Sequence, residues 1–301
     1  MRLTFSGTGT ALITPFTTSG AIDETAIRLL ATRQVDAGVH FVVPCGTTGE
    51  TPTLSSEERR RVVALVAEAV DGRAMVLAGA GGYDTRAVVR AVAEFEQAGA
   101  HGILSVTPYY NKPSQEGLVQ HYRAIAESTT LPIIIYNVPG RTGCNVEPAT
   151  LVRLAEIPNI VGVKEASGNM TQMVEIRRLV PRDFLVLSGD DALALPLMAV
   201  GGSGVISVVA NEAPAETVQL IEAAERGDFA AARRWHDKLL PLMQVNFVEA
   251  NPVPVKFAMA AMGLCEEVYR LPLVPPRDTS QARILAVLRE FGLPVVAAAR
   301  A

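Results

Sequence analysis

The chain has 301 residues, of which 49% are hydrophobic and 19% charged, a composition typical of globular proteins with a buried core. This length suits one large barrel domain or two ordinary domains. The formal net charge of −4 at pH 7 excludes the global basic field that attracts nucleic acids.

The three cysteines, Cys45, Cys144 and Cys265, are an odd number at wide spacings. They argue against a disulfide framework and against a CxxC metal site, and they favour a reducing compartment. Residues 1–16 lack the apolar core and cleavage site of a secretory signal, and apolar runs elsewhere end well before membrane-spanning length. We therefore expect a cytoplasmic protein with neither a membrane nor a nucleic-acid partner.

Short apolar segments recur along the chain, and several are rich in Val and Ile. Near-continuous runs of this kind are typical of parallel strands that are buried on both faces. The expected strands are 10–16, 40–46, 74–80, 102–110, 132–138, 160–167, 184–191 and 204–211.

Segments with helical spacing alternate with these strands, and Ser55 with Glu58 forms a capping-box pattern at the start of one of them. The expected helices are 23–37, 55–70, 85–98, 114–128, 148–156 and 170–180. Eight βα units favour an α/β fold with a closed (β/α)8 or TIM barrel over an open sheet. We expect the barrel in 1–225 and a C-terminal helical extension in 226–301, part of which could instead be the last barrel helix. The extension should hold helices at 228–249, 253–263 and 279–291.

Reactive side chains concentrate where the expected strands end, which is where TIM barrels carry their active sites. Lys164 is the sharpest signal, because an ammonium among apolar neighbours is costly to bury. Burial disfavours the charged form of an amine, and a neutral amine can attack a ketone to form an iminium. The alternative is a lysine that extends outward or pairs with Glu165, although Glu165 lies on the opposite face of a strand.

Other candidates are weaker when taken singly. Tyr136 could transfer protons to and from an imine, or it could be an ordinary half-buried tyrosine. Thr47 and Thr48, between two glycines in GTTGE (46–50), could bind a small carboxylate or simply form a turn. Arg141 presents a planar fork suited to a carboxylate, but an arginine in a Pro-Gly loop is usually solvated.

Cofactor and metal motifs are not apparent in the sequence. GAGG (79–82) lacks the GK[ST] of a phosphate-binding loop, and GGSG (201–204) opens no expected helix. The four histidines are isolated from one another. Asp190 and Asp191 could bind a cation, but adjacent carboxylates more often cap a helix. We expect no cofactor and no catalytic metal.

The motifs together resemble the dihydrodipicolinate synthase (4-hydroxy-tetrahydrodipicolinate synthase) family over nearly the whole chain. They are GTGTALITPF, PCGTTGE, VTPYYNKPSQEG, YNVPGRTG, GVKEASGN, LSGDD, GVISV and NPVPVK. The wider superfamily of pyruvate-dependent Schiff-base lyases and aldolases shares the barrel, a GxTGE-like loop, the tyrosine and the lysine. The arginine of NVPGRTG and the YYNKPSQEG stretch distinguish the synthase.

The resemblance implies that Lys164 forms an imine and then an enamine with pyruvate, which attacks L-aspartate 4-semialdehyde. The product would be 4-hydroxy-tetrahydrodipicolinate, an intermediate of lysine and diaminopimelate biosynthesis. The implied proton relay is Tyr136, Thr47 and Tyr110, with Tyr110 acting in a neighbouring subunit of a homotetramer built as a dimer of dimers. Implied substrate contacts come from Thr48, Arg141, the Ile206 backbone and Gly189.

One region departs from the family pattern. Lysine-inhibited relatives place a ring such as histidine, an amide and a carboxylate in an allosteric pocket at the dimer interface. The matching positions here are Ser56, Arg59, Tyr83 and Ala87, while Tyr109 is retained. Loss of a carboxylate and gain of a cation disfavour binding of a cationic amino acid, so we expect weak or no inhibition by L-lysine.

Two rival functions remain open at this point. The first is a related retro-aldol pyruvate lyase, such as N-acetylneuraminate lyase or a keto-deoxy sugar acid aldolase, which would need polyol-binding groups where this chain has Arg141. The second is a barrel that senses a keto acid without catalysis, which the fold alone does not exclude.

Overall fold

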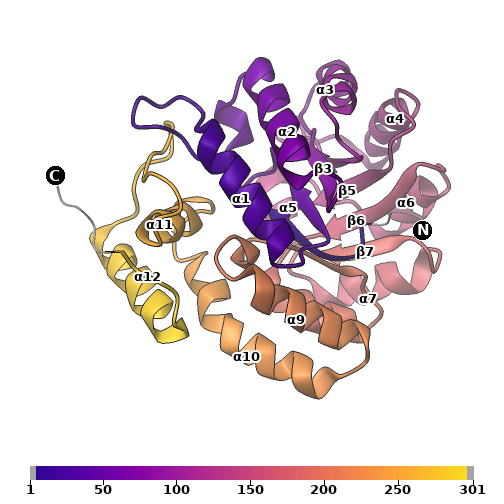
Figure 1. Cartoon of the computed structure of the whole chain (residues 1–301). Helices are drawn as coiled ribbons and strands as arrows, with labels where there is room; N and C mark the ends of the chain where they lie inside the picture. The colour runs from indigo at the N-terminus through magenta and orange to yellow at the C-terminus, as the bar shows by residue number, and fades with distance from the viewer. Residues whose placement is uncertain (1–4, 297–301) are drawn as a thin grey trace.

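The computed structural model describes residues 5–296, in which eight strands form one closed barrel (Figure 1). Each strand pairs in parallel with its neighbours in sequence, and β8 pairs with β1. The strands are β1 Gly7–Ala11, β2 Phe41–Val43, β3 Met75–Gly79, β4 Gly102–Val106, β5 Ile133–Asn137, β6 Ile160–Glu165, β7 Leu185–Ser188 and β8 Gly204–Ser207. This arrangement confirms the predicted TIM barrel.

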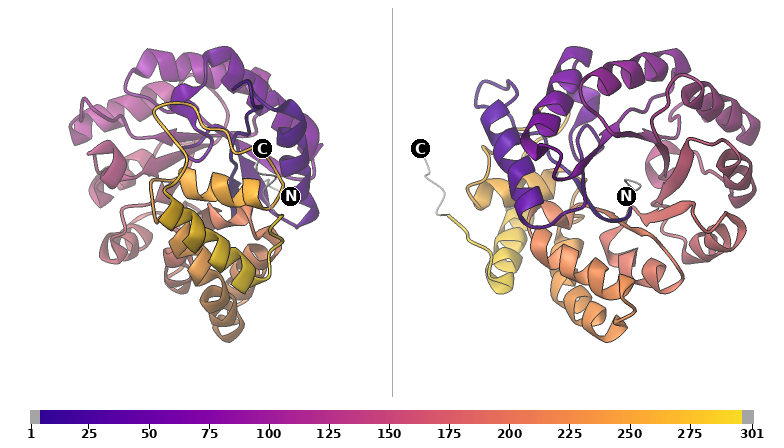
Figure 2. Two further views of the ribbon diagram at one scale, coloured as in Figure 1. Left: turned by 90° about the vertical axis from the view of Figure 1, so that its left-hand side faces the viewer. Right: turned by 45° about the vertical axis from the view of Figure 1, so that its right-hand side comes forward.

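Helices surround the barrel as an outer ring, which is clearest in the right-hand view of Figure 2. The main ones are α1 Glu24–Asp36, α2 Ser56–Val70, α3 Thr85–Gln97, α4 Gln115–Ala126, α6 Pro148–Ala155, α7 Met170–Leu179, α8 Ala194–Ala199 and α9 Pro214–Glu225. Short helical turns lie in the loops at η1 Thr51–Thr53, α5 Pro139–Thr142, η2 Asp191–Leu193 and η3 Val209–Asn211. No helix within residues 5–296 combines the length and apolarity needed to cross a bilayer.

The capping box predicted at the start of α2 is present. The Ser55 hydroxyl accepts a hydrogen bond from the Glu58 backbone N–H at 3.1 Å, and the Glu58 carboxylate accepts from the Ser55 N–H at 2.9 Å. Helices α8 and α9 were not predicted. In α9, buried residues lie on most sides of the helix, so the sequence shows no single apolar stripe there.

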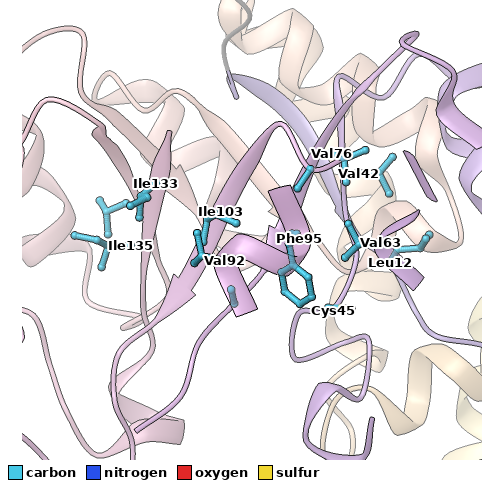
Figure 3. Close-up of a cluster of buried hydrophobic side chains, with 14 of the residues drawn as sticks. Leu12, Val42, Cys45, Val63, Val76, Val92, Phe95, Ile103, Ile133 and Ile135 are labelled. Atoms are coloured by element: carbon cyan, nitrogen blue, oxygen red, sulfur yellow. The ribbon is translucent and has the colours of Figure 1, made fainter. Parts of the chain in front are cut away.

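Side chains alternate between two buried layers along each strand. Those that point inward fill the barrel, among them Phe41, Leu77, Leu104, Ile134 and Leu187. Those that point outward pack against the helices in the larger core shown in Figure 3, including Val42, Val76, Ile103, Ile133 and Ile135. Burial on both faces explains why the strands read as continuous apolar runs.

The first strand was predicted at 10–16, but β1 is Gly7–Ala11. Glycine is depleted in strands, so the glycines at the start of β1 did not look like strand residues and the strand was predicted to begin too late in the sequence. The glycine at position 9 is required here because the Phe41 ring packs against it, and a Cβ would lie 2.1 Å from that ring. Strand β4 also ends earlier than predicted, at Val106, so Tyr109 and Tyr110 lie in the following loop.

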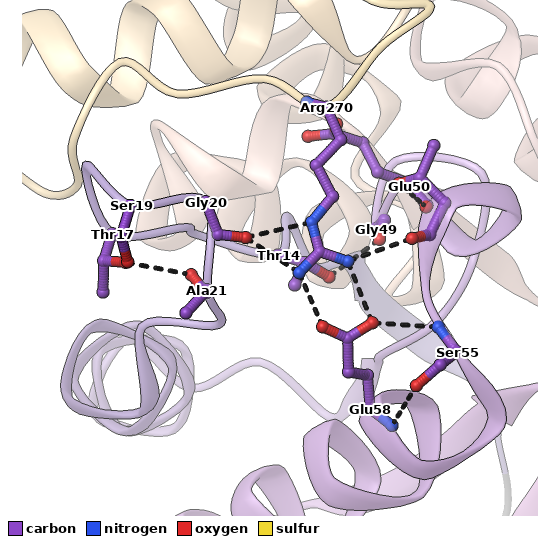
Figure 4. Close-up of polar contacts among 11 residues, drawn as sticks. Thr14, Thr17, Ser19, Gly20, Ala21, Gly49, Glu50, Ser55, Glu58 and Arg270 are labelled. Carbon is purple, nitrogen blue, oxygen red and sulfur yellow. Dashed lines mark hydrogen bonds and ion pairs between the residues drawn. The ribbon is translucent and has the colours of Figure 1, made fainter.

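Three helices follow the barrel and confirm the predicted C-terminal helical extension: α10 Phe229–Val245, α11 Val253–Ala261 and α12 Asp278–Phe291. In Figure 1, α10 lies against α9, while α11 and α12 lie at one side of the barrel. An ion pair ties α11 to the loop after β2, since Lys256 Nζ lies 2.5 Å from Glu50 Oε1 and both side chains are fully buried. Arg270 adds a second tie by binding the Gly20 carbonyl and the Glu58 carboxylate (Figure 4).

Candidate active site

Lys164 lies on β6 with its side chain inside the barrel and only 6% exposed. Its neighbours Val163 and Glu165 point outward, where Glu165 accepts hydrogen bonds of 2.8 Å from the Asn137 side chain and the Ser167 N–H. The predicted alternative of a Lys164–Glu165 ion pair is therefore excluded. Within the described residues, the Lys164 amine forms no ion pair at all.

Tyr136 is the register partner of Lys164 on the adjacent strand β5. The lysine Nζ lies 4.3 Å from the centroid of the tyrosine ring. This ring also lines a cavity of about 390 Å³ at the carboxyl ends of the strands. The phenol thus borders both the buried amine and a space that can hold a small molecule.

The cavity contains several of the predicted site residues. Thr47, Tyr136 and Arg141 line it, together with Cys45, Arg59 and Tyr109. Burial raises the pKa of the Cys45 thiol to about 12, so this cysteine is a neutral wall group. Arginine and threonine beside an apolar wall suit a small substrate that carries a carboxylate.

The GTTGE loop holds a strained conformation. Cys45, directly before the loop, and Glu50, its last residue, have φ of 58° and 53°, a left-handed conformation that is uncommon for residues other than glycine. Strain of this kind persists only where surrounding contacts fix it, and it concentrates at functional sites. Here the Thr14 hydroxyl donates to the Gly49 carbonyl at 2.8 Å, and the Asn251 amide donates to the Thr48 hydroxyl at 3.0 Å.

Gly189 lies beside the lysine, and neither Gly189 nor Ile206 is among the residues that line the cavity. A Cβ at position 189 would stand 2.9 Å from Lys164 Cε, so glycine leaves room for the lysine stem. Ile206 is buried on β8, where it pairs in register with Gly9. Thr48 is likewise buried, and it follows the lining residue Thr47 in the chain.

Lys164 contacts the lining residue Tyr136 but is not itself among the residues that line the cavity. Tyr110 stands apart from the cavity within a single chain. It is 90% exposed and has a φ of 69°. The adjacent Tyr109 lines the cavity instead and makes an edge-to-face contact with Tyr83, with ring centroids 5.2 Å apart. Burial raises the pKa of the Tyr109 phenol.

A second cavity, of about 360 Å³, adjoins the first. It collects all of the positions matched to the family's lysine pocket: Ser56, Arg59, Tyr83, Ala87 and Tyr109. Arg59 and Tyr109 line both cavities, so the two spaces share a wall. Asp84 is a carboxylate that lines the second cavity.

Asn251 and Lys256 had no predicted role, although both lie in the NPVPVK motif. The side chain of Asn251 contacts Thr48, and its carbonyl accepts a 3.3 Å hydrogen bond from Arg141. Lys256 stands in the apolar stretch VPVKFAMAA, which is the same kind of signal that singled out Lys164. A buried lysine calls for a partner, and the partner is Glu50.

The adjacent carboxylates after β7 are structural. Asp190 accepts a hydrogen bond from the Ala192 N–H and so caps η2. Asp191 is buried and accepts from the N–H groups of Val208 and Val209. Across residues 5–296 there is no group of three or more His, Cys, Asp or Glu side chains that could hold a metal ion.

Comparison with known proteins identifies the family. The dihydrodipicolinate synthetase family profile matches residues 4–291. The 4-hydroxy-tetrahydrodipicolinate synthase of Chlorobium chlorochromatii is 54% identical over 96% of this chain and 98% of its own length. The dihydrodipicolinate synthase structure from Aquifex aeolicus superposes with a TM-score of 0.95 at 44% identity, covering 97% of this chain and all of that one.

A third relative is the dihydrodipicolinate synthase of Acinetobacter baumannii, in a crystal structure described as complexed with pyruvate. It superposes with a TM-score of 0.95 at 40% identity and covers 97% of this chain and 100% of that chain. The match thus extends over the barrel and the helices that follow it. This chain belongs to the dihydrodipicolinate synthetase family.

Proposed function

We propose that this enzyme condenses pyruvate with L-aspartate 4-semialdehyde through a Schiff base on Lys164. The product is 4-hydroxy-tetrahydrodipicolinate, so the enzyme is a lyase of lysine and diaminopimelate biosynthesis, as the names of its relatives indicate. One observation carries the proposal: a buried lysine amine, which has no ion-pair partner in the part of the chain that the structure describes, lies against a tyrosine at the edge of a cavity. Such an amine is suited to attack on a ketone.

The reaction begins when Lys164 Nζ attacks the keto carbon of pyruvate and forms a carbinolamine. Loss of water, with a proton delivered by the Tyr136 phenol, gives the iminium, which draws electrons from the methyl group. Loss of a methyl proton then gives an enamine. The enamine carbon attacks the aldehyde of the semialdehyde, and the substrate's own amine displaces Lys164 as the ring closes.

The remaining predicted residues have supporting roles in this proposal. Thr48 and the Ile206 backbone bind the pyruvate part beside Gly189, and Thr47 relays protons from Tyr136. The pyruvate complex described for the Acinetobacter baumannii relative supports a keto-acid site in this barrel. Arg141 binds the semialdehyde carboxylate, and its place in the cavity wall favours this substrate over a polyol aldehyde.

We also propose that the working form is a homotetramer, built as a dimer of dimers, in which Tyr110 completes the site of a neighbouring subunit. The 90% exposure of this tyrosine and its left-handed backbone support that role, because a strained and exposed aromatic residue is suited to contact a partner. We place the enzyme in the cytoplasm, as the sequence analysis expects.

The Schiff base can be trapped directly. Borohydride added with pyruvate should reduce the imine and leave a carboxyethyl group on the Lys164 peptide, detected by mass spectrometry. Addition of the semialdehyde beforehand should lower the yield, because turnover releases the lysine. Lys164→Ala should give no adduct. A wild-type enzyme that turns over pyruvate without forming this adduct would refute the proposed mechanism.

Shared sites can be tested by mixing subunits. Tyr110→Phe and Lys164→Ala should each be nearly inactive alone. If Tyr110 acts in the neighbouring subunit, hybrids formed by dissociating and reassociating the two variants regain activity, because one site then holds an intact Lys164 and an intact Tyr110. Absence of any recovery in verified hybrids would contradict this arrangement.

A further inference from the structure

Asn251 lies between α10 and α11 and is buried, with 6% of its surface exposed. Its side-chain Nδ2 donates a hydrogen bond of 3.0 Å to the hydroxyl of Thr48. Its main-chain carbonyl accepts a hydrogen bond of 3.3 Å from the guanidinium of Arg141. One residue therefore contacts two groups that the proposed function places at opposite ends of the substrate adduct.

The hydrogen bond from Asn251 determines what the Thr48 hydroxyl can do. A hydroxyl has one hydrogen to donate and two lone pairs that accept. The amide of Asn251 occupies a lone pair, which leaves the hydrogen of Thr48 available for another acceptor. A carboxylate is acceptor-only, so a hydroxyl held in this state is prepared to bind one.

The amide is not placed for stability alone. Its Oδ1 is buried and accepts no hydrogen bond within the described part of the chain. A buried polar atom without a partner destabilises the fold, and each such atom in a native protein calls for an explanation. Orientation of Thr48 supplies one, because Thr48 is the single hydrogen-bond partner of this side chain in residues 5–296.

Helix α11 holds Asn251 at a fixed distance from the loop that carries Thr48. Lys256, on α11, forms the buried ion pair with Glu50 and also lies 3.9 Å from the centroid of the Phe16 ring. The Arg270 backbone N–H lies 3.5 Å from Glu50 Oε2, and its side chain binds Glu58 at the start of α2 (Figure 4). The loop and the extension are thus joined at further points that follow Thr48 and Asn251 in the chain.

We propose that Asn251 is a positioning residue for the condensation: its amide directs the Thr48 hydroxyl toward the keto acid, and its carbonyl holds Arg141 on the aldehyde side. This inference depends on the proposed function. It assigns to the C-terminal helical extension a part in binding the first substrate.

The two contacts can be separated because one uses the side chain and the other the backbone. Asn251→Ala removes the amide and keeps the carbonyl. The Thr48 hydroxyl would then no longer be directed at the pyruvate carboxylate. We expect the KM for pyruvate to rise roughly tenfold, which corresponds to loss of one hydrogen bond to a charged group. The KM for the semialdehyde should stay within about twofold, since the Arg141 contact is retained.

A double-mutant cycle tests whether Asn251 acts through Thr48. In a Thr48→Val background, Asn251→Ala should raise the KM for pyruvate no further. Asn159→Ala is the matched control, because the Asn159 amide binds three carbonyls at the other end of the barrel. This control should lower thermal stability and leave both KM values unchanged.

Several outcomes would overturn the inference. Equal increases in both KM values, or additive effects of Asn251→Ala and Thr48→Val, would show a general structural role. Asn251→Asp is the second variant should the alanine variant not fold, because a carboxylate keeps the shape but cannot donate to Thr48; an unchanged KM for pyruvate would then refute the inference. The borohydride adduct on wild-type Lys164 is measured in a separate experiment. Failure of the proposed function can therefore be distinguished from failure of the proposed role of Asn251.

Discussion

The Lys164 amine lies 4.3 Å from the centroid of the Tyr136 ring because the two residues are register partners on adjacent parallel strands. Parallel pairing keeps the side chains of register partners on one face of a sheet. The pair points into the barrel, where the phenol can reach both the amine and the cavity. Proton transfer and nucleophilic attack are thereby assigned to two side chains fixed by the same pair of strands.

Replacement of the phenol tests this assignment. Tyr136→Phe should lower kcat by about 10²- to 10⁴-fold, which is the usual range for a positioned acid–base group. The borohydride adduct on Lys164 should still form at long times, because the nucleophile remains. Tyr122→Phe is the matched control, since that buried phenol binds the Ser105 carbonyl outside the barrel. A kcat of Tyr136→Phe close to that of the control would contradict the proton-transfer role.

The proposed Schiff-base formation also requires space beside the side chain of Lys164. In Gly189→Ala the added methyl group would stand 2.9 Å from Lys164 Cε and 2.6 Å from the Ala166 Cβ, so the stem must move. Misplacement of a reacting group by about 1 Å can slow a reaction roughly a hundredfold. We expect a slower rate of borohydride trapping with pyruvate, measured by the time course of the adduct. Gly117→Ala, on the outer helix α4, should trap at the wild-type rate.

The second cavity predicts poor regulation by L-lysine. At the positions matched to the family's lysine pocket, Arg59 adds a cation and Ala87 stands where lysine-inhibited relatives have a carboxylate, so binding of an ammonium at these positions is disfavoured. Initial rates should fall by less than about twofold with 1 mM L-lysine. The double variant Arg59→His with Ala87→Glu should become more sensitive. Strong inhibition of the wild-type enzyme would overturn this expectation, and Asp84→Asn would then identify the compensating carboxylate.

Glu212 predicts a pH dependence of stability. This fully buried carboxyl follows η3, and burial raises its pKa from an ordinary 4.5 to about 8, although a 2.6 Å hydrogen bond from Asn246 opposes the shift. The nearby Asp191 also raises the pKa, and Arg33 on α1 lowers it. Among residues 5–296, Glu212 Oε1 and Asn246 Oδ1 are both buried without a hydrogen-bond partner, which a proton on the carboxyl would relieve.

The sign follows from proton binding. Between pH 4.5 and about 8 the folded state holds a proton on Glu212 that the unfolded state has released, so stability falls as the pH rises through this window. The slope is at most about 1.4 kcal/mol per pH unit for one group. Glu212→Gln mimics the protonated form and should remove this slope in urea unfolding between pH 5 and about 8. A constant difference between variant and wild type over that range would contradict the assignment, and the exposed Glu225→Gln should parallel wild type.

Features that depend on residues close together in the sequence were predictable. Lys164 is conspicuous as a cation in an apolar strand, and the alternation of side chains placed Glu165 on the other face. Ser55 and Glu58 determine the start of α2 through contacts three residues apart. The inward direction of the Lys164 side chain was therefore predictable from strand parity.

Contacts that depend on distant parts of the chain were not predictable. Gly9 appears unsuited to a strand until the Phe41 ring against it is known. The roles of Asn251 and Lys256 depend on partners more than 200 positions away, which no local pattern reveals. The proposed action of Tyr110 in a second subunit lies outside what the coordinates of one chain determine.

The hydrogen bond from Asn251 to Thr48 spans 203 positions, and the ion pair from Lys256 to Glu50 spans 206. During synthesis every barrel strand emerges from the ribosome before Asn251 and Lys256 do. Each new molecule therefore passes through a stage in which its strands are complete but the loop after β2 lacks its contacts with Asn251 and Lys256. Premature stop codons after β8 would accordingly yield chains that contain the nucleophile and still bind the first substrate poorly.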